Sequence, residues 1–507
     1  MSNNASLRLS SLFVCGLSLT LPLACGDDGI GSSSATDGGS SDTQGSGAGS
    51  TAASDGTTAT TQASGGGSES ATSSDTTTGS TSGMPTATAT ATSGETTSTT
   101  GETTTGGAVE GFQVGFDVVD VSPTPAQLDE EDIYMGAYGA PFTRGPAKGV
   151  HDRIYVRSMA IEAEGVGFVM AIVDLPGMGN QNTRAIREMV ADMSDLEESQ
   201  VLIGTTHTHS SPDLMGLWGG VPDGYRNQLR EQAALSMVAA WEAREVADLY
   251  VASGTAPNRN RRGWDFTDDA MVVLDARDLE GERIGTLVNF AAHPIILGES
   301  NKEISCDYTG PMVLALEEEL GAPVALFNGT LGDVSPDVPD GEYENDFEQA
   351  AFYGELLSGI AAGLVADAEL IEPVVTLDYR EWTEKVDNFL FQAAAQLGIL
   401  QYDFDMKGLE LEVLTQSTYF RLGAQVQGVA FPGESLTRNG LAIKEAMKAP
   451  HRMILGNTGD ALGYFIPSDE WQTGKNDDYE ESVSLGKTAG DNARDEIVEM
   501  LKADVDF

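Results

Sequence analysis

From Phe112 onward, short apolar runs alternate with amphipathic stretches. The runs are rich in β-branched residues and apolar on both faces, as in strands that are covered by helices. The expected strands are 167–175, 200–204, 271–275, 284–292, 323–328 and 425–431. The expected helices are 183–193, 225–245, 311–320, 344–366 and 441–448. This alternation predicts an α/β fold, a single large domain with a mixed sheet flanked by helices.

The pattern is absent from residues 26–107, which are nearly all Ser, Thr, Gly and Ala and contain no Lys or Arg. Burial of so few large apolar side chains cannot offset the conformational entropy that the chain would lose on folding. We therefore expect a disordered linker that acts as a tether. The folded domain is therefore expected to span 108–507, without a second linker or an internal repeat.

Residues 1–25 have the pattern of a bacterial export signal. Arg8 is followed by an apolar run from Leu12 to Ala24, which is too short to span a bilayer. Cys25 follows a small residue at the end of this run, as in a lipobox, so we expect a lipid anchor at Cys25. An ordinary secretory signal is the alternative. The protein is expected to be exported and anchored to the cell envelope, at the outer membrane or cell surface, or released from it.

The chain has 28 Lys+Arg against 78 Asp+Glu, a formal charge of −50, and most of the excess acid lies in 108–507. This charge excludes a nucleic-acid partner, because phosphate contacts require a basic surface. It also disfavours electrostatic docking on anionic lipid, so a lipid substrate would have to enter through a pocket. The oligomeric state is left open.

Cysteines provide no disulfide in the folded domain. Cys15 and Cys25 lie in the signal, which leaves Cys306 alone. We expect Cys306 to be a buried structural thiol.

Histidines are few, and three of the five follow predicted strands. His207 and His209 come directly after one strand, at a spacing that places both side chains on one side of an extended chain. His293 follows a second strand, Ser335 a third and Glu434 a fourth. Ligands bind beyond the carboxyl ends of the strands in α/β sheets, so these side chains are expected to share one edge.

Neutral imidazoles, a carboxylate and an open position are what a catalytic zinc site requires. Zinc would lower the pKa of a bound water and polarise an amide or ester carbonyl. The residues by themselves leave structural roles open, since Asp333 and Ser335 also suit a turn and Glu434 suits a helix start. His151 and His451 are expected to be structural or exposed.

A series of short motifs runs through residues 112–480 in a recognisable order. They are MGAY at 135–138, GVHDRIYVR at 149–157, THTHS at 206–210, NR at 260–261, HP at 293–294, DYTG at 307–310, GDVSP at 332–336, FPGE at 431–434, GY at 463–464 and YE at 479–480. Together they resemble the neutral/alkaline (non-lysosomal) ceramidase family. Its members are zinc amidases that hydrolyse the N-acyl bond of ceramide.

The resemblance implies a ligand set for Zn²⁺. His207 and His293 would bind the metal, and Glu434 and Tyr464 would complete its coordination. His209 would stand beside the metal and orient water or substrate.

The resemblance also implies catalytic residues. Ser335 matches the nucleophile of the family, with a zinc-activated water as the alternative attacker. Arg261 matches the active-site arginine, with Arg259 as a close competitor, and Tyr479 would hydrogen-bond near the scissile carbonyl. A cation and hydroxyl donors are what an anionic tetrahedral intermediate requires.

The implied activity is a zinc-dependent amidohydrolase, ceramidase-like, acting on a small-molecule or lipid amide such as N-acylsphingosine or a related N-acyl lipid. The stretches from His207 to His293 and from Ser335 to Glu434 are shorter than in the family, and no C-terminal immunoglobulin-like domain is expected. Two alternatives remain: a zinc-dependent esterase or acyl hydrolase on a non-sphingolipid substrate, and a catalytically silent ligand-binding lipoprotein on the same scaffold.

Overall fold

The computed structural model describes residues 111–139, 142–407, 410–505 and 507, and these belong to one compact unit. The expected signal at 1–25, the linker at 26–107 and the anchor at Cys25 lie outside the described residues.

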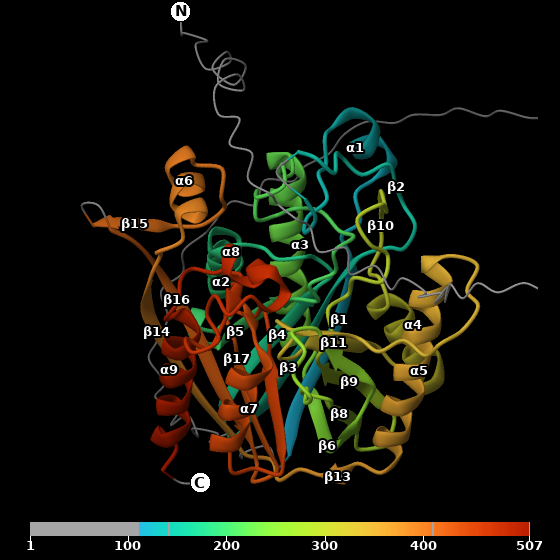
Figure 1. Ribbon diagram of the computed structural model, residues 1–507. Coiled ribbons are helices and arrows are strands. Elements are labelled where there is room, and N and C mark those ends of the chain that lie inside the picture. The colour runs from blue at the N-terminus through green and yellow to red at the C-terminus, as the bar shows by residue number, and fades with distance from the viewer. Residues whose placement is uncertain (1–110, 140–141, 408–409, 506) are drawn as a thin grey trace, which may run out of the picture. The chain divides into compact units, whose positions relative to one another are not determined.

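The large sheet is mixed, and it runs through the middle of the molecule (Figure 1). Its strands lie in the order β11-β9-β8-β6-β1-β3-β4-β5, and β13 pairs with β6. Strands β4 and β5 are parallel, as are β9 and β11, and the other pairs along this order are antiparallel. The strands are β1 (Phe112–Asp120), β3 (Tyr155–Ala163), β4 (Val166–Val173), β5 (Val201–Thr205), β6 (Glu245–Thr255), β8 (Ala270–Asp278), β9 (Arg283–Phe290), β11 (Val324–Asn328) and β13 (Glu369–Leu370).

A second sheet packs on one face of the first. Its strands lie in the order β14-β16-β17-β19, with β15 on the edge of β16, and β17 and β19 are parallel. Phe168 of the large sheet meets Phe420 of the second across this interface, with ring centroids 5.2 Å apart. The strands are β14 (Val375–Lys385), β15 (Phe404–Lys407), β16 (Glu410–Leu422), β17 (Val426–Ala430) and β19 (His451–Leu455).

Helices cover the two outer faces, so the layers run helix, sheet, sheet, helix (Figure 1). The large sheet is covered by α2 (Asn180–Met193), α3 (Asp223–Glu242), α4 (Thr309–Leu320) and α5 (Asp346–Ala366). The second sheet is covered by α6 (Phe389–Leu397), α7 (Thr437–Ala446) and α9 (Ala489–Ala503). Helix α5 is long and apolar enough to cross a membrane, but its buried side chains belong to the core under α4.

Alternate residues of a strand of the large sheet pack into two different cores, which explains why the sequence shows continuous apolar runs. In β8, Val272 and Leu274 face the second sheet, whereas Met271 and Val273 face α4 and α5. Both faces of the stretch from Met271 to Leu274 are covered, so this stretch has no polar side.

Short segments join the layers near the strand ends. Strand β7 (Asn258–Asn260) pairs with β12 (Val334–Pro336), β18 (Glu434–Ser435) with β20 (Tyr464–Phe465), and β2 (Gly149–Val150) with β10 (Glu303–Ile304). The remaining helices are α1 (Pro125–Glu130), η1 (Glu198–Gln200), η2 (Lys475–Asp478) and α8 (Tyr479–Ser482).

The α/β class and the mixed sheet flanked by helices are confirmed. Each expected strand and helix is present, with bounds shifted by a few residues. The stacking of a second sheet is an addition that the sequence did not indicate, because β14 and β16 are long strands whose polar residues interrupt the apolar pattern.

Gly115 of β1 allows α3 to lie directly on the large sheet. A Cβ at this position would lie 2.1 Å from the carbonyl oxygen of Ala240 and 2.9 Å from the amide nitrogen of Arg244. We therefore expect Gly115→Ala to lower the free energy of unfolding by about 1–3 kcal/mol, as overpacking does. Urea denaturation of the full chain measures this.

Gly359 provides the matched control, because it is exposed in α5 and a Cβ there would meet nothing within 4 Å. Gly359→Ala is expected to stabilise by about 0.5–1 kcal/mol through helix propensity. Equal effects of the two substitutions would contradict the packing argument.

Candidate metal centre

The carboxyl ends of strands from both sheets meet at one place. Strand β5 leads into His207 and His209, and β9 leads into His293. Strand β17 of the second sheet leads into Glu434, which opens β18 and pairs with Tyr464 of β20. The centre therefore lies at the seam between the two sheets.

Asn328, at the end of β11, ties these strand ends together. Its side-chain Nδ2 donates to the carbonyl oxygens of Thr206, at 3.0 Å, and Ala292, at 2.9 Å. Its own carbonyl oxygen accepts from Gly456 N, just beyond β19, at 2.8 Å. One buried amide thus fixes the two histidine-bearing loops relative to each other. The sequence analysis missed this residue, whose only signal is an Asn that ends an apolar strand.

Three imidazoles and a carboxylate converge in a buried cluster. The ligand atoms of His207, His209 and His293 all lie within 4.8 Å of one another. Oε2 of Glu434 lies 3.0 Å from His293 Nε2 and 3.3 Å from His207 Nε2. The Tyr464 hydroxyl lies 3.3 Å from His293 Nε2. All five residues are at most 7% exposed.

Backbone carbonyls decide which atoms face the centre of this cluster. His207 Nδ1 donates to the Pro176 carbonyl at 2.5 Å, and His293 Nδ1 donates to the Val334 carbonyl at 3.2 Å. These bonds place the proton on Nδ1 and leave each Nε2 as a lone pair directed at Glu434. Two imidazole lone pairs and a carboxylate then face one another without a proton between them. A cation bound between these acceptors would remove the electrostatic repulsion among them.

The pKa shifts favour the neutral forms of His209 and His293 and the ionised form of Glu434. Burial lowers the pKa of His293 to about 4 and holds that of His209 well below its usual range. Burial by itself would raise the pKa of Glu434, but His207 and His293 hold it well below its ordinary value. Neutral imidazole and carboxylate are the protonation states that a metal ion requires.

The spacing of the acceptor atoms fits a small divalent cation. Four ligands at the 2.0–2.1 Å distances typical of zinc lie about 3.3 Å apart around a tetrahedral ion. The separations of 3.0 to 3.3 Å from Glu434 to the two imidazoles, and of 3.3 Å from Tyr464 to His293, agree with this edge length. The residues present therefore fit zinc.

His209 belongs to the same cluster, and its expected place beside the metal stays a prediction. Its Nε2 lies 3.2 Å from His207 Nε2, and its Nδ1 is buried with no hydrogen-bond partner among the described residues. Arg144 holds the loop by donating from Nη1 to the His209 carbonyl, and the Tyr138 ring meets the imidazole edge-on.

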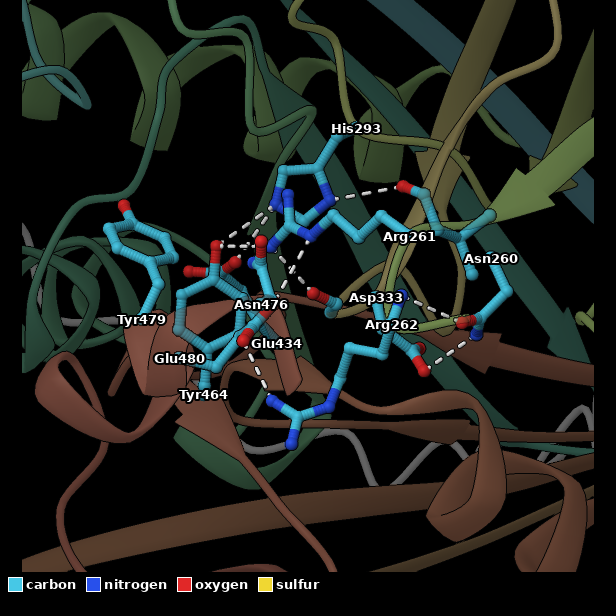
Figure 2. A network of polar contacts seen from close by, with 12 residues as sticks. Asn260, Arg261, Arg262, His293, Asp333, Glu434, Tyr464, Asn476, Tyr479 and Glu480 are labelled. Carbon is cyan, nitrogen blue, oxygen red and sulfur yellow. Dashed lines mark hydrogen bonds and ion pairs between the residues drawn. The ribbon is translucent and has the colours of Figure 1, made fainter. Parts of the chain in front are cut away.

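A largely buried cation, Arg261, contacts Tyr464 (Figure 2). Arg261 Nη2 donates to the Tyr464 hydroxyl at 2.9 Å and to the Gly332 carbonyl at 2.9 Å, and its Nε lies 3.3 Å from Glu480. Burial would lower the pKa of Arg261, but Tyr464 and Glu480 hold it above its usual value, so the guanidinium stays charged. Arg259 is exposed, so Arg261 is the arginine that reaches this cluster.

Ser335 and Tyr479 flank the cluster. Ser335 lies in β12 next to Val334, whose carbonyl orients His293, and its Oγ is buried with no hydrogen-bond partner among the described residues. The ring of Tyr479 packs against Tyr464 with centroids 6.0 Å apart, as Figure 2 shows.

An apolar cavity adjoins the cluster on the side of His207 and Glu434. Its walls come from the loop after β5 and from the segment that contains α6. The lining residues are Pro176, His207, Met215, Leu217, Trp218, Phe391, Leu400, Tyr402, Glu434, Asn457, Ala461, Gly463 and Val483. A deep apolar wall beside a polar cluster is typical of a site for a small molecule with a hydrophobic part.

The other histidines and Cys306 lie apart from the cluster. His151 stacks on Phe347 at the surface, and His451 bonds to Ser253 and Glu369. Cys306 is buried, and its Sγ contacts the Arg153 carbonyl.

Comparison with known proteins bears on this site. Neutral ceramidase of Drosophila pseudoobscura pseudoobscura is 24% identical over 264 residues, which cover 45% of this chain and 36% of that protein. Neutral ceramidase of Pseudomonas aeruginosa is 24% identical over 263 residues, covering 45% of this chain and 39% of that protein. The chain is a relative of the neutral ceramidases. This confirms the resemblance drawn from the motifs.

Solved structures agree on the fold. The crystal structure of neutral ceramidase from Pseudomonas aeruginosa matches with a TM-score of 0.65 at 18% identity, over 78% of this chain and 74% of that one. A ceramidase complexed with C2 matches with the same TM-score at 17% identity, over 78% and 75%. No family model matches the chain. The aligned stretch spans less than two-fifths of the curated neutral ceramidases.

Metal content provides the direct test of the centre. We expect about one zinc per chain in the purified full-length protein, and less than about one-tenth of that in His207→Ala and in His293→Ala, because each removes a ligand from a four-ligand set. Plasma mass spectrometry measures both.

Two further variants complete this test. His209→Ala is expected to keep the metal if His209 stands beside it, and His451→Ala, far from the cluster, serves as the control. Full metal content in His293→Ala would contradict the assignment.

Proposed function

We propose that the chain is a zinc-dependent amidohydrolase that cleaves the N-acyl bond of a lipid amide, and that it works at the cell envelope. The acceptor cluster of His207, His293 and Glu434 carries this proposal, because its atoms are arranged for a cation. The relation to neutral ceramidases supports amide hydrolysis. The pattern of residues 1–25 supports export, with an anchor at Cys25.

In this proposal His207, His293, Glu434 and Tyr464 hold the zinc. The metal, when bound, supplies a Lewis acid for the amide carbonyl and lowers the pKa of a bound water. Every other function falls to the side chains of the chain. His209, neutral and buried, is positioned to accept a proton or to orient the attacking group.

Ser335 is the proposed nucleophile, because it directly follows Val334, whose carbonyl orients His293, and its buried hydroxyl has no hydrogen-bond partner among the described residues. Arg261 is a fixed cation that stabilises the anionic tetrahedral intermediate through Tyr464, and Tyr479 adds a hydroxyl on the same side. Preorganised donors in a dry site are worth more than the same donors in water.

The apolar cavity suits the acyl chain of the substrate. Met215, Leu217, Phe391 and Leu400 provide aliphatic and aromatic contacts beside Glu434. A hydrocarbon chain gains about 0.8 kcal/mol per buried methylene in such a site.

Turnover tests the reaction class. The zinc-loaded full chain is expected to release fatty acid from a short-chain N-acylsphingosine, and Ser335→Ala is expected to lower kcat by about 10³-fold or more without loss of zinc. Ser194→Ala, which removes a hydroxyl at the end of α2 away from the site, is the control.

The alternatives predict different results in the same assay. Undiminished kcat in Ser335→Ala would assign the attack to water. Cleavage of the matched ester without any amide would assign an esterase, and binding that persists with chelator but without turnover would assign a silent binding protein.

The cavity wall gives a second prediction. Phe391→Ala removes the α6 side chain that lines the cavity, so KM for a long-chain amide is expected to rise about tenfold, with little change for a two-carbon acyl group. Phe389, on the exposed side of the same helix, provides the matched control. Equal effects of Phe391→Ala on both chain lengths would contradict the assignment of the wall.

A further inference from the structure

Asn457 is a buried amide that lines the apolar cavity together with His207 and Glu434. It follows β19 and is only 3% exposed. Its Nδ2 has no hydrogen-bond partner among the described residues. Burying an unpaired amide is unfavourable, so a group in this state needs an explanation.

The backbone of Asn457 is fixed independently of its side chain. The residue has a φ of +47°, a left-handed conformation that Asn tolerates better than most residues. Its N–H donates to the Gly433 carbonyl at 3.1 Å, and its carbonyl accepts from Thr205 N at 3.1 Å. Gly433 directly precedes Glu434, and Thr205 lies two residues before His207. These backbone bonds therefore fix the position of the Asn457 side chain relative to the metal cluster.

Three other polar side chains that line the cavity already have partners. His207 Nδ1 donates to Pro176, the Tyr402 hydroxyl donates to the Ala461 carbonyl, and Glu434 faces the imidazoles. Most of the remaining lining is apolar. The Asn457 amide is thus a donor available to a ligand in an otherwise hydrophobic wall.

The cavity meets the acyl half of the substrate. Of the described residues, its lining includes Asn457 but not Ser335, Tyr464 or Arg261, which gather around the scissile carbonyl in the proposed function. Most of the cavity lining is apolar, and the proposed function places the hydrocarbon chain of the acyl group there. We therefore assign the acyl half to the cavity.

We propose that Asn457 is a specificity-determining residue whose Nδ2 donates a hydrogen bond to a hydroxyl oxygen near the carbonyl end of the acyl chain. The preferred substrates are then N-(2-hydroxyacyl) amides over their unsubstituted counterparts. This inference rests on the proposed function, since it assigns the substrate of the same site.

The experiment measures the turnover of four lipid amides by the zinc-loaded full chain. The four have equal chain length and no zwitterionic head group. They carry a hydroxyl on the acyl half, on the amine half, on both halves or on neither. For the wild type, kcat/KM is expected to be about tenfold higher with the acyl-side hydroxyl, the value of one net hydrogen bond. The same amides are measured for binding by calorimetry.

Asn457→Gly removes the side-chain amide and tolerates the positive φ. It is expected to reduce the acyl-hydroxyl preference, the ratio of kcat/KM with and without that hydroxyl, to within about twofold of unity. Asn457→Ala removes the same amide in a less permissive backbone, so it should lose the preference equally. Glu164→Gly is the control, because Glu164 is an exposed turn residue with a φ of +53°.

Unchanged preference in Asn457→Gly, equal loss on all four amides, or loss of an amine-side preference alone would each overturn the proposal. Cleavage without any preference refutes the inference and leaves the proposed function standing. Hydroxyl-selective binding without cleavage supports the inference and refutes the proposed function. If no amide is bound or cleaved, both fail.

Discussion

The imidazoles of His207 and His293 turn the same kind of atom, a lone pair, toward the carboxylate of Glu434. Backbone carbonyls of Pro176 and Val334 hold both Nδ1 protons on the opposite side of the rings. The cluster is buried, so water cannot screen the repulsion between these acceptors. A structure that keeps them within about 3 Å of one another must stabilise that arrangement elsewhere and accept a cation at its centre.

The cluster of acceptors is stabilised by the loops that follow the strands of the two sheets, because these loops meet and are bonded to one another. His207 and His293 leave strands of the large sheet, whereas Glu434 leaves the second sheet, so the cluster exists only when the sheets are stacked. Asn328 and the backbone of Asn457 bind the loops across this seam. His207 itself has a φ of +65°, a strained backbone for a residue other than glycine, and such strain persists where surrounding bonds enforce it. A metal bound at this cluster would therefore stabilise the packing of the sheets and be stabilised by it.

The sequence predicts the centre better than its surroundings, for a physical reason. Strand ends are local features, so the rule that ligands lie beyond them brings out His207, His293 and Glu434 from apolar runs alone. Asn328 and Asn457 act through partners far away in sequence, which no periodicity reveals. The choice between Arg259 and Arg261 is of the same kind, because it depends on the bonds of Arg261 to Tyr464 and Glu480, which are distant in sequence. Local patterns give the ligands, and tertiary contacts give the residues that orient them.

Separate segments build the metal centre and the cavity wall, and this separation decides how substrate preference can change. The ligands come from strand ends that the whole sandwich fixes, but Phe391 and Leu400 come from the connection between β14 and β15, which includes α6. A connection can vary in length and sequence with little effect on the strands that it joins. The cluster can thus be retained while the wall, and with it the preferred acyl chain, changes. The shared fold therefore constrains the cluster more tightly than it constrains the wall of the cavity.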